Sequence, residues 1–424
     1  MIRIGKPYVT TKDNRAMLCA HIEISDDTSA KYIEVSKRLV NCPWLTDVDY
    51  PPQVWKQPDG CLYFSVPAEM ADGLCTERSN AFVVAFFWYA CVTGADITFE
   101  APMSERLYKG LTEMLMPQLI KDDIKPIRLI GPVTSDPVAC KNGVISGMSA
   151  GVDSLFTLHT YGGDDAPQGM RLTHLSYYQL FYYLFLKRQF STDIDMIYNG
   201  EDAINNHVLL RAQAIAAHNN LPLVHVVSNL DRDFYRGGSI YTAMYRYLAC
   251  TLSLEHLFST YISSSSGHDS GQVEVCLFVP TQHYEDILVE CCQTETLRYV
   301  NSDHVTRTEK LRVIADNPDF QRYASVCFNI REDAKNCGEC YGCWKTMIPL
   351  DMLGKLHLFG EVFDLPKYYA NRRQTFQDLI LFSHRPEASS ARETVRQLIT
   401  LAREKEEENE AAKLFLELCS IFRQ

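Results

Sequence analysis

The feature that most constrains the fold of this chain is a short β-prone run, followed by small residues and an apolar helix start, in residues 143–158. Val144 and Ile145 favour a strand, and Leu155 and Phe156 open the helix. The small residues between them let the backbone approach an anion closely, and the first N–H groups of the helix point at that anion with the helix dipole behind them. The stretch therefore predicts a phosphate-binding loop.

The end of this loop distinguishes between two kinds of phosphate site. A Walker A loop would end in Gly-Lys-Ser/Thr, whereas this loop ends in Asp153 and Ser154 without a lysine. The order resembles the Ser-Gly-Gly-x-Asp-Ser signature of the PP-loop ATP pyrophosphatases, with Ala150 where that family usually has glycine. Enzymes of that family split ATP between its α and β phosphates, adenylate a carbonyl oxygen of the substrate and release pyrophosphate.

This resemblance implies a binding site for ATP and Mg²⁺. The residues that would hold the nucleotide are Ser149, Ala150, Gly151, Val152, Asp153 and Ser154. Asp153 would also help to place the magnesium ion. The alternative is an ordinary turn of small residues in which Asp153 or Ser154 caps the helix.

A constellation of cysteines lies further along the chain. Cys327, Cys337, Cys340 and Cys343 follow the pattern C-x9-C-x2-C-x2-C, whose tight spacings let one turn present three sulfurs to one ion. Four thiolates fill a tetrahedral shell and leave no open position for water, so the pattern predicts a structural Zn²⁺ site. Free thiols and an iron–sulfur cluster held by the same ligands are the alternatives.

Together the two motifs resemble the 7-cyano-7-deazaguanine synthases of the queuosine pathway (QueC), over about residues 140–350. Those synthases use ATP to activate the carboxylate of 7-carboxy-7-deazaguanine, form an amide with ammonia and dehydrate it to the nitrile. This chain departs from the compact synthases by an N-terminal region of about 125 residues and a charged C-terminal helical region. It looks more like the extended QueC-like proteins of bacterial antiphage gene clusters, which would join a deazaguanine carboxylate to a protein amine.

The same resemblance supplies two candidate catalytic cations. Thr306 to Lys310 lie just before an apparent helix that starts near Leu311. QueC-like chains place a residue near the pyrophosphate at a threonine-then-lysine step before this helix. Lys310, with Arg307 as the second choice, is therefore expected to neutralise the leaving group. The alternative is a capping box with a solvated lysine.

Short apolar runs alternate with helical patterns after residue 127, which predicts an α/β domain with a doubly wound, mostly parallel sheet of the PP-loop type. This domain is expected to cover residues 127–350 and to include the zinc site. Residues 1–126 are expected to form an α+β accessory domain, and residues 351–424 a helical extension. In the accessory region, strands are expected at 20–24, 32–35 and 61–66, and helices at 81–91 and 105–119.

The composition limits the partners and the compartment. The formal net charge of −12 argues against a broad basic surface, so nucleic acid is not expected as a partner. The apolar runs are too short to span a bilayer, and no secretory signal is evident near the first methionine. The fifteen cysteines are then most simply free thiols plus a metal site in a reducing cytoplasm.

The favoured hypothesis is therefore an ATP-dependent ligase that forms a carbon–nitrogen bond on a 7-deazaguanine carboxylate, with a protein partner or protein substrate as one option. A homodimer is implied only by the resemblance. Two alternatives stay open. One is a PP-loop tRNA sulfur transferase with an iron–sulfur cluster, against which the acidic net charge argues. The other is a nucleotide-binding subunit of a complex, without turnover, in which Ala150 marks a decayed loop.

Overall fold

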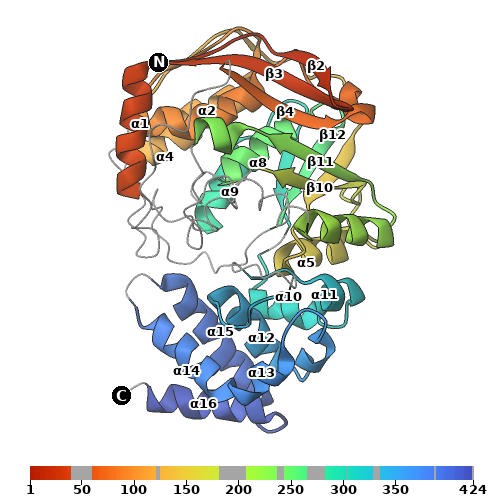
Figure 1. Ribbon diagram of the computed structural model, residues 1–424. Helices are drawn as coiled ribbons and strands as arrows, with labels where there is room; N and C mark the ends of the chain where they lie inside the picture. The colour runs from red at the N-terminus through yellow and green to blue at the C-terminus, as the bar shows by residue number, and fades with distance from the viewer. Residues whose placement is uncertain are drawn as a thin grey trace.

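A computed structural model describes residues 1–39, 60–120, 125–180, 207–235, 243–264, 282–302, 304–327, 335–385 and 388–422. Over these ranges the chain is an α/β protein built on an 11-stranded mixed sheet, in which parallel pairings outnumber antiparallel ones. The sheet occupies the upper part of the molecule in Figure 1, and the C-terminal helices form a separate lower layer. The expected α/β class is confirmed.

One half of the sheet is parallel and carries the predicted phosphate-binding loop. Its strands are β9 (Gly143–Gly147), β10 (His174–Gln179), β11 (Leu223–Ser228), β12 (Phe258–Ser263) and β13 (Arg298–Asn301). They lie in the order β13-β12-β9-β10-β11, so the chain runs outward from β9 on one side and then crosses to the other side. This is a doubly wound order, and its switch point lies beside β9, where ligands of such sheets bind.

The other half of the sheet comes from the N-terminal region. Its strands are β1 (Ile2–Ile4), β2 (Tyr8–Lys12), β3 (Arg15–Ile24), β4 (Cys61–Pro67), β5 (Ile97–Phe99) and β7 (Leu129–Ile130). β4 pairs antiparallel with β11 through Val227–Ser65 and Ser228–Phe64. Strands on both sides of residue 126 therefore share one sheet. The division of the chain into domains stays a prediction.

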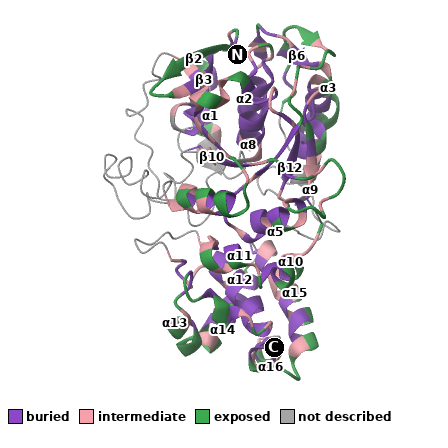
Figure 2. Ribbon diagram, turned by 90° about the vertical axis from the view of Figure 1, so that its right-hand side faces the viewer, coloured by how far each residue is buried: buried purple, intermediate pink, exposed green. Residues whose placement is uncertain are grey.

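Two hydrophobic cores lie on opposite faces of the parallel half. Neighbouring residues of β9 separate them, because Ile145 belongs to one cluster and Val144 to the other. The first core contains helix α2 (Asn80–Thr93), which packs against α8 (Ala243–Leu252). The side chains of α2 are apolar on all sides and nearly all buried, as Figure 2 shows in purple. The second core joins α5 (Val152–Tyr161) to the C-terminal helices.

One expectation about the N-terminal region is wrong. Residues 32–35 were predicted as a strand, but they lie inside helix α1 (Asp26–Leu39). Asp26 and Asp27 in its first turn stabilise the positive end of the helix dipole. Tyr32 is buried and stacks on Tyr89 of α2, with 3.9 Å between the ring centroids. An alternation over four residues is too short to distinguish a strand from one buried stripe of a helix.

The C-terminal region is helical, as expected. It contains α12 (Tyr341–Met352), α13 (Leu365–Ala370), α14 (Arg372–Ser383), α15 (Ser389–Lys405) and α16 (Glu410–Ile421). Phe376, Leu398 and Phe415 are fully buried among these helices. The acidic side chains around residues 404–410 are exposed, so this charge run is a solvated face.

The remaining elements are short or connect these layers. They are η1 (Ala68–Gly73), β6 (Met103–Ser104), α3 (Glu105–Lys109), η2 (Gly110–Leu115), α4 (Met116–Ile120), β8 (Val133–Thr134), η3 (Leu230–Phe234), α9 (Gln282–Cys291), α10 (Arg307–Ile314), α11 (Pro318–Tyr323) and η6 (Leu356–Phe359). Residues 207–218 are also helical. None of the helices in the described ranges is long and apolar enough to cross a lipid bilayer.

Candidate functional site

The loop after β9 lies at the switch point of the sheet and has an unusual backbone. Ala150 is fully buried with φ of 57°, in the left-handed region that glycine adopts most easily. Its carbonyl oxygen accepts a hydrogen bond from the Ser325 N–H at 2.8 Å. The signature that this loop resembles has glycine at this position, and glycine adopts a left-handed backbone without a steric cost. The tight loop is formed with alanine in its place.

The small residues after Ala150 start helix α5 and keep its first turn open. Gly151 is the N-cap with extended backbone and no side-chain cap, so the alternative in which Asp153 or Ser154 caps this helix is wrong. The Ser149 and Ser154 hydroxyls lie 3.2 Å apart, and Ser154 also donates to the Gly151 carbonyl at 3.1 Å. Backbone N–H groups at the start of α5 are therefore available to an anion.

Asp153, in the first turn of α5, lies between two cations of helix α10. Its Oδ2 is 3.2 Å from a guanidinium nitrogen of Arg307, and its Oδ1 is 3.2 Å from Nζ of Lys310. Burial alone would raise the pKa of Asp153, but the charges of Arg307 and Lys310 outweigh it and lower that pKa below its ordinary value. Asp153 is thus an ionised carboxylate at neutral pH.

The start of α10 presents both cations to the loop. The Thr306 side chain caps the helix by accepting from the Glu309 N–H at 3.3 Å, and Arg307 and Lys310 follow one turn apart. Lys310 is fully buried, and its Nζ lies 5.5 Å from the centroid of the Phe156 ring. The alternative for this segment was a capping box with a solvated lysine. Thr306 does cap the helix, but Lys310 is buried, so the solvated lysine is contradicted.

Two further side chains belong to this site and were missed from the sequence. Thr346 of α12 accepts a hydrogen bond from Arg307 at 3.2 Å. Lys345, its neighbour, is half-buried, and burial together with the charge of Arg307 lowers its pKa to about 7, while Asp153 acts in the opposite direction. Only the position of Lys345 just after the cysteine motif could have drawn attention to it.

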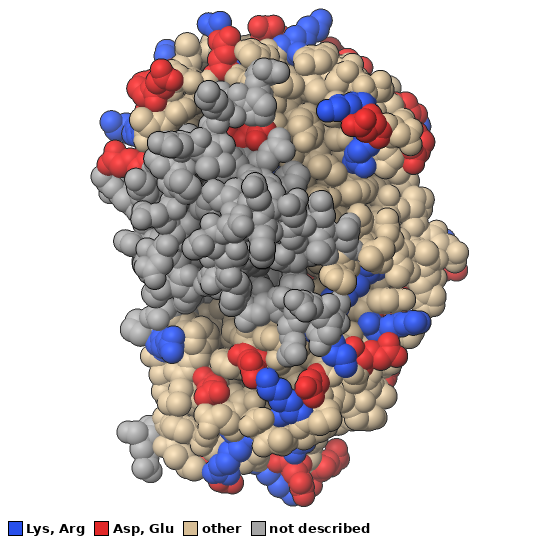
Figure 3. All heavy atoms as spheres, in the orientation of Figure 1, with Lys and Arg blue, Asp and Glu red and all other residues tan. Residues whose placement is uncertain are grey.

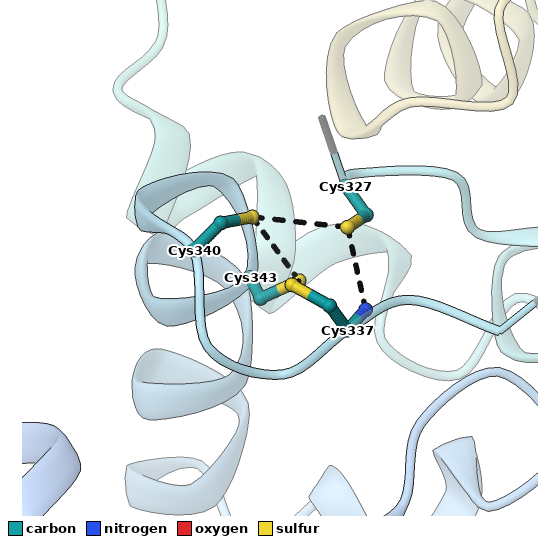
Figure 4. Close-up of side chains that lie close together, drawn as sticks. All are labelled: Cys327, Cys337, Cys340 and Cys343. Carbon is teal, nitrogen blue, oxygen red and sulfur yellow. Dashed lines mark hydrogen bonds between the residues drawn. The ribbon is translucent and has the colours of Figure 1, made fainter. Parts of the chain in front are cut away.

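The four cysteines gather into one cluster, shown in Figure 4. Cys327 comes from the segment after α11, Cys337 from a loop, and Cys340 and Cys343 from the start of α12. Their sulfurs all lie within 4.8 Å of one another, and three sulfur pairs are 3.6, 3.8 and 3.9 Å apart. A tetrahedral zinc site with Zn–S bonds of about 2.3 Å places its sulfurs about 3.8 Å apart.

The cluster therefore could hold a metal ion such as zinc. Backbone N–H groups support it, since Gly338 donates to the Cys343 sulfur and Cys337 donates to the Cys327 sulfur, both at 3.3 Å. Such donors favour the thiolate form that a metal requires. The spacing suits one central ion, whereas a cluster of several irons needs a wider cage.

The cysteine cluster is connected to both sides of the loop site. Ser325, which binds the Ala150 carbonyl, lies two residues before Cys327. Cys340 is the N-cap of α12, the helix that carries Lys345 toward Asp153. A metal held by the cysteines would therefore fix the position of Ser325, which bonds the loop at Ala150, and the position of helix α12.

Other polar groups at strand ends are placed differently. Asn229 follows β11 and joins the two halves of the sheet, since its side chain accepts from the Tyr63 N–H at 3.0 Å and donates to the Cys61 carbonyl at 2.8 Å. It is thus structural. The polar run of residues 263–268 follows β12, and from residue 265 on it lies outside the described residues.

The described surface carries charged side chains of both signs. On the described part of the face in Figure 3, Lys and Arg side chains are interspersed with Asp and Glu rather than gathered into one basic patch.

No protein-family model, curated protein or solved structure matches this chain.

Proposed function

We propose that this protein is an ATP-dependent enzyme that adenylates a carboxylate and releases AMP and pyrophosphate to form an amide or a nitrile. One observation carries the proposal. Asp153, at the open N-terminus of α5, pairs with Arg307 and Lys310 at the switch point of a doubly wound sheet. Two cations paired with one carboxylate leave a surplus of positive charge, which is the complement of a polyphosphate.

The residues divide into two roles in this proposal. Backbone N–H groups of the loop and of the first turn of α5 hold phosphate oxygens. Arg307 and Lys310 neutralise the charge that develops on the departing pyrophosphate, and their burial strengthens this interaction. The Asp153 carboxylate is an oxygen ligand of the type that Mg²⁺ prefers. When bound, Mg²⁺ would supply further charge neutralisation at the phosphates.

The chemistry is that of an acyl adenylate. A carboxylate oxygen of the substrate attacks the α phosphorus, and pyrophosphate leaves with the electron pair of the broken P–O bond. An amine then attacks the acyl carbon, loses a proton, and AMP leaves with the carboxylate oxygen, which gives an amide. With ammonia as the amine, the amide oxygen attacks the α phosphorus of a second ATP and pyrophosphate leaves; the nitrogen then loses its protons and AMP departs with that oxygen, which gives the nitrile. The protein contributes positioning and charge neutralisation, so no cysteine nucleophile is needed.

The substrate class rests on the resemblance to the QueC-like proteins. It suggests 7-carboxy-7-deazaguanine or a related acid, with ammonia or an amine of a partner protein as the acceptor. In the second case the product is a modified protein, which fits the antiphage setting of the extended QueC-like proteins. A cytoplasmic location and a structural Zn²⁺ belong to the same proposal.

The test is AMP release from ATP with 7-carboxy-7-deazaguanine and an ammonium salt. Asp153→Ala should lower the rate by about a hundredfold or more, because it removes the magnesium ligand and the carboxylate that pairs with Arg307 and Lys310. Glu309→Gln is the matched control, since Glu309 lies on α10 with Arg307 and Lys310, is half exposed and pairs with Arg312. Full activity of Asp153→Ala in a folded protein would contradict the assignment of this loop.

A further inference from the structure

A second group of metal-ligand side chains lies at the amino ends of strands β9 and β12, and the phosphate loop lies at the opposite edge of the sheet. It consists of Cys75, Glu77 and His256, whose ligand atoms all lie within 4.8 Å of one another. Cys75 and Glu77 come from the segment between η1 and α2, and His256 from the turn just before β12. The Glu77 Oε2 lies 2.9 Å from the His256 Nε2 and 3.7 Å from the Cys75 sulfur.

His256 is oriented as metal-binding histidines are. Its Nδ1 lies 2.7 Å from the Ala139 carbonyl oxygen. A carbonyl accepts only, so Nδ1 carries a proton. Nε2 donates to the Glu77 carboxylate, and a metal ion that takes the place of that proton would be bound by the Nε2 lone pair beside Glu77 and Cys75. A hydrogen bond from the second ring nitrogen to a carbonyl or carboxylate is the usual support of a histidine ligand, because it fixes the tautomer and the ring plane.

We propose that Cys75, Glu77 and His256 form a second zinc site in this protein. A thiolate, an imidazole and a carboxylate are the three ligand types that Zn²⁺ takes in proteins, and water completes the tetrahedron. Cys75 is buried, whereas the Glu77 side chain is 53% exposed, so the ion has a buried anchor and an open route from solvent. This site is independent of the proposed function.

The surroundings indicate what the ion does. Lys141 donates its backbone N–H to the His256 carbonyl at 2.9 Å and pairs with Asp72 at 2.5 Å. Cys75 donates its own N–H to the Ser253 carbonyl at 3.1 Å. The three ligands thus join the N-terminal region to the turns that precede β9 and β12. Zinc here is a cross-link between the two halves of the sheet and lies away from the loop of Asp153.

The test measures bound metal in the purified full chain, after dialysis against a zinc buffer, by plasma mass spectrometry. We expect two zinc ions per chain, one for each group of ligands. His256→Gln and Cys75→Ser should each remove one ion and leave the other, whereas Cys343→Ser removes the ion of the four-cysteine cluster. Cys140→Ser is the matched control, because Cys140 is a nearby thiol outside the group, and it should keep both ions.

Cobalt gives a second readout that does not depend on zinc content. In a variant in which Cys327, Cys337, Cys340 and Cys343 are all replaced by serine, added Co²⁺ should produce a thiolate-to-cobalt charge-transfer band that Cys75→Ser abolishes. Glu77→Gln should retain the band and weaken cobalt binding by about tenfold or more, and because Glu77 is exposed this variant should fold normally. One zinc ion per chain in the wild type, or a cobalt band that survives Cys75→Ser, would overturn the proposal.

Discussion

Asp153 and Lys310 were both predicted as residues of one candidate site. Asp153 and Lys310 were expected near the nucleotide, and they lie in contact with each other because both belong to helix starts at the same edge of the sheet. Lys345 was not expected, since its role depends on α12 lying beside α10. The spacing of residues along the sequence carries no information on that packing.

Ala150 gives a stability prediction at this scale. Ala150→Gly relieves a left-handed strain of about 1–2 kcal/mol, but it removes a buried methyl worth about 0.8 kcal/mol and frees the unfolded chain by about 0.4–1 kcal/mol. We therefore expect the free energy of unfolding to change by less than about 1 kcal/mol, measured by urea denaturation.

A matched control for this prediction is Ala212, which is equally buried but lies in the helix of residues 207–218. Ala212→Gly should cost about 2 kcal/mol, from helix propensity and the lost methyl together. Equal losses for the two variants would show that Ala150 is not strained in solution.

A long apolar pattern predicted helix α2, over residues 81–91. Short apolar runs that alternate with helical patterns predicted β9, β10, β11 and β12, whereas β13 was not expected. Residues 32–35 of helix α1 were predicted as a strand, because an alternation over four residues fits both a strand and a helix. Tyr32 of α1 is buried against Tyr89, which lies far along the chain. Tertiary packing decides such short segments.

Helix α12 makes the cysteine cluster part of the site, which predicts a linked loss of metal and activity. Cys343→Ser should lower zinc content, melting temperature and AMP release together, because α12 carries Lys345 and Thr346 toward Asp153. A hundredfold loss of metal affinity removes up to about 2.7 kcal/mol of stabilisation. Calorimetry and metal analysis of the same preparation measure the first two effects.

The control for this variant is Cys419→Ser, which changes a buried thiol of α16 that lies outside the cluster. It should keep the metal and the AMP release of the wild type. Loss of zinc in Cys343→Ser without any change in AMP release would show that the cluster does not position the site.

At the scale of the whole molecule, one sheet joins strands from both sides of residue 126. The pairing of β4 with β11 joins residues about 160 positions apart, and Arg15 reinforces it by donating to the Ser65 and His225 carbonyls at 2.8 and 2.9 Å. No local pattern encodes such a pairing, because an edge strand can accept many partners. The α/β class and the switch-point loop were accessible from sequence, whereas the continuous sheet was not.

The central claim is that the loop of Asp153 splits ATP between its α and β phosphates to activate a carboxylate. The most direct measurement uses 7-carboxy-7-deazaguanine whose carboxylate carries heavy oxygen, with ATP, an ammonium salt and the wild-type protein. Mass spectrometry should find the heavy oxygen in AMP, because AMP leaves the acyl carbon with that atom. ADP as the nucleotide product, or AMP without the heavy oxygen, would contradict the account.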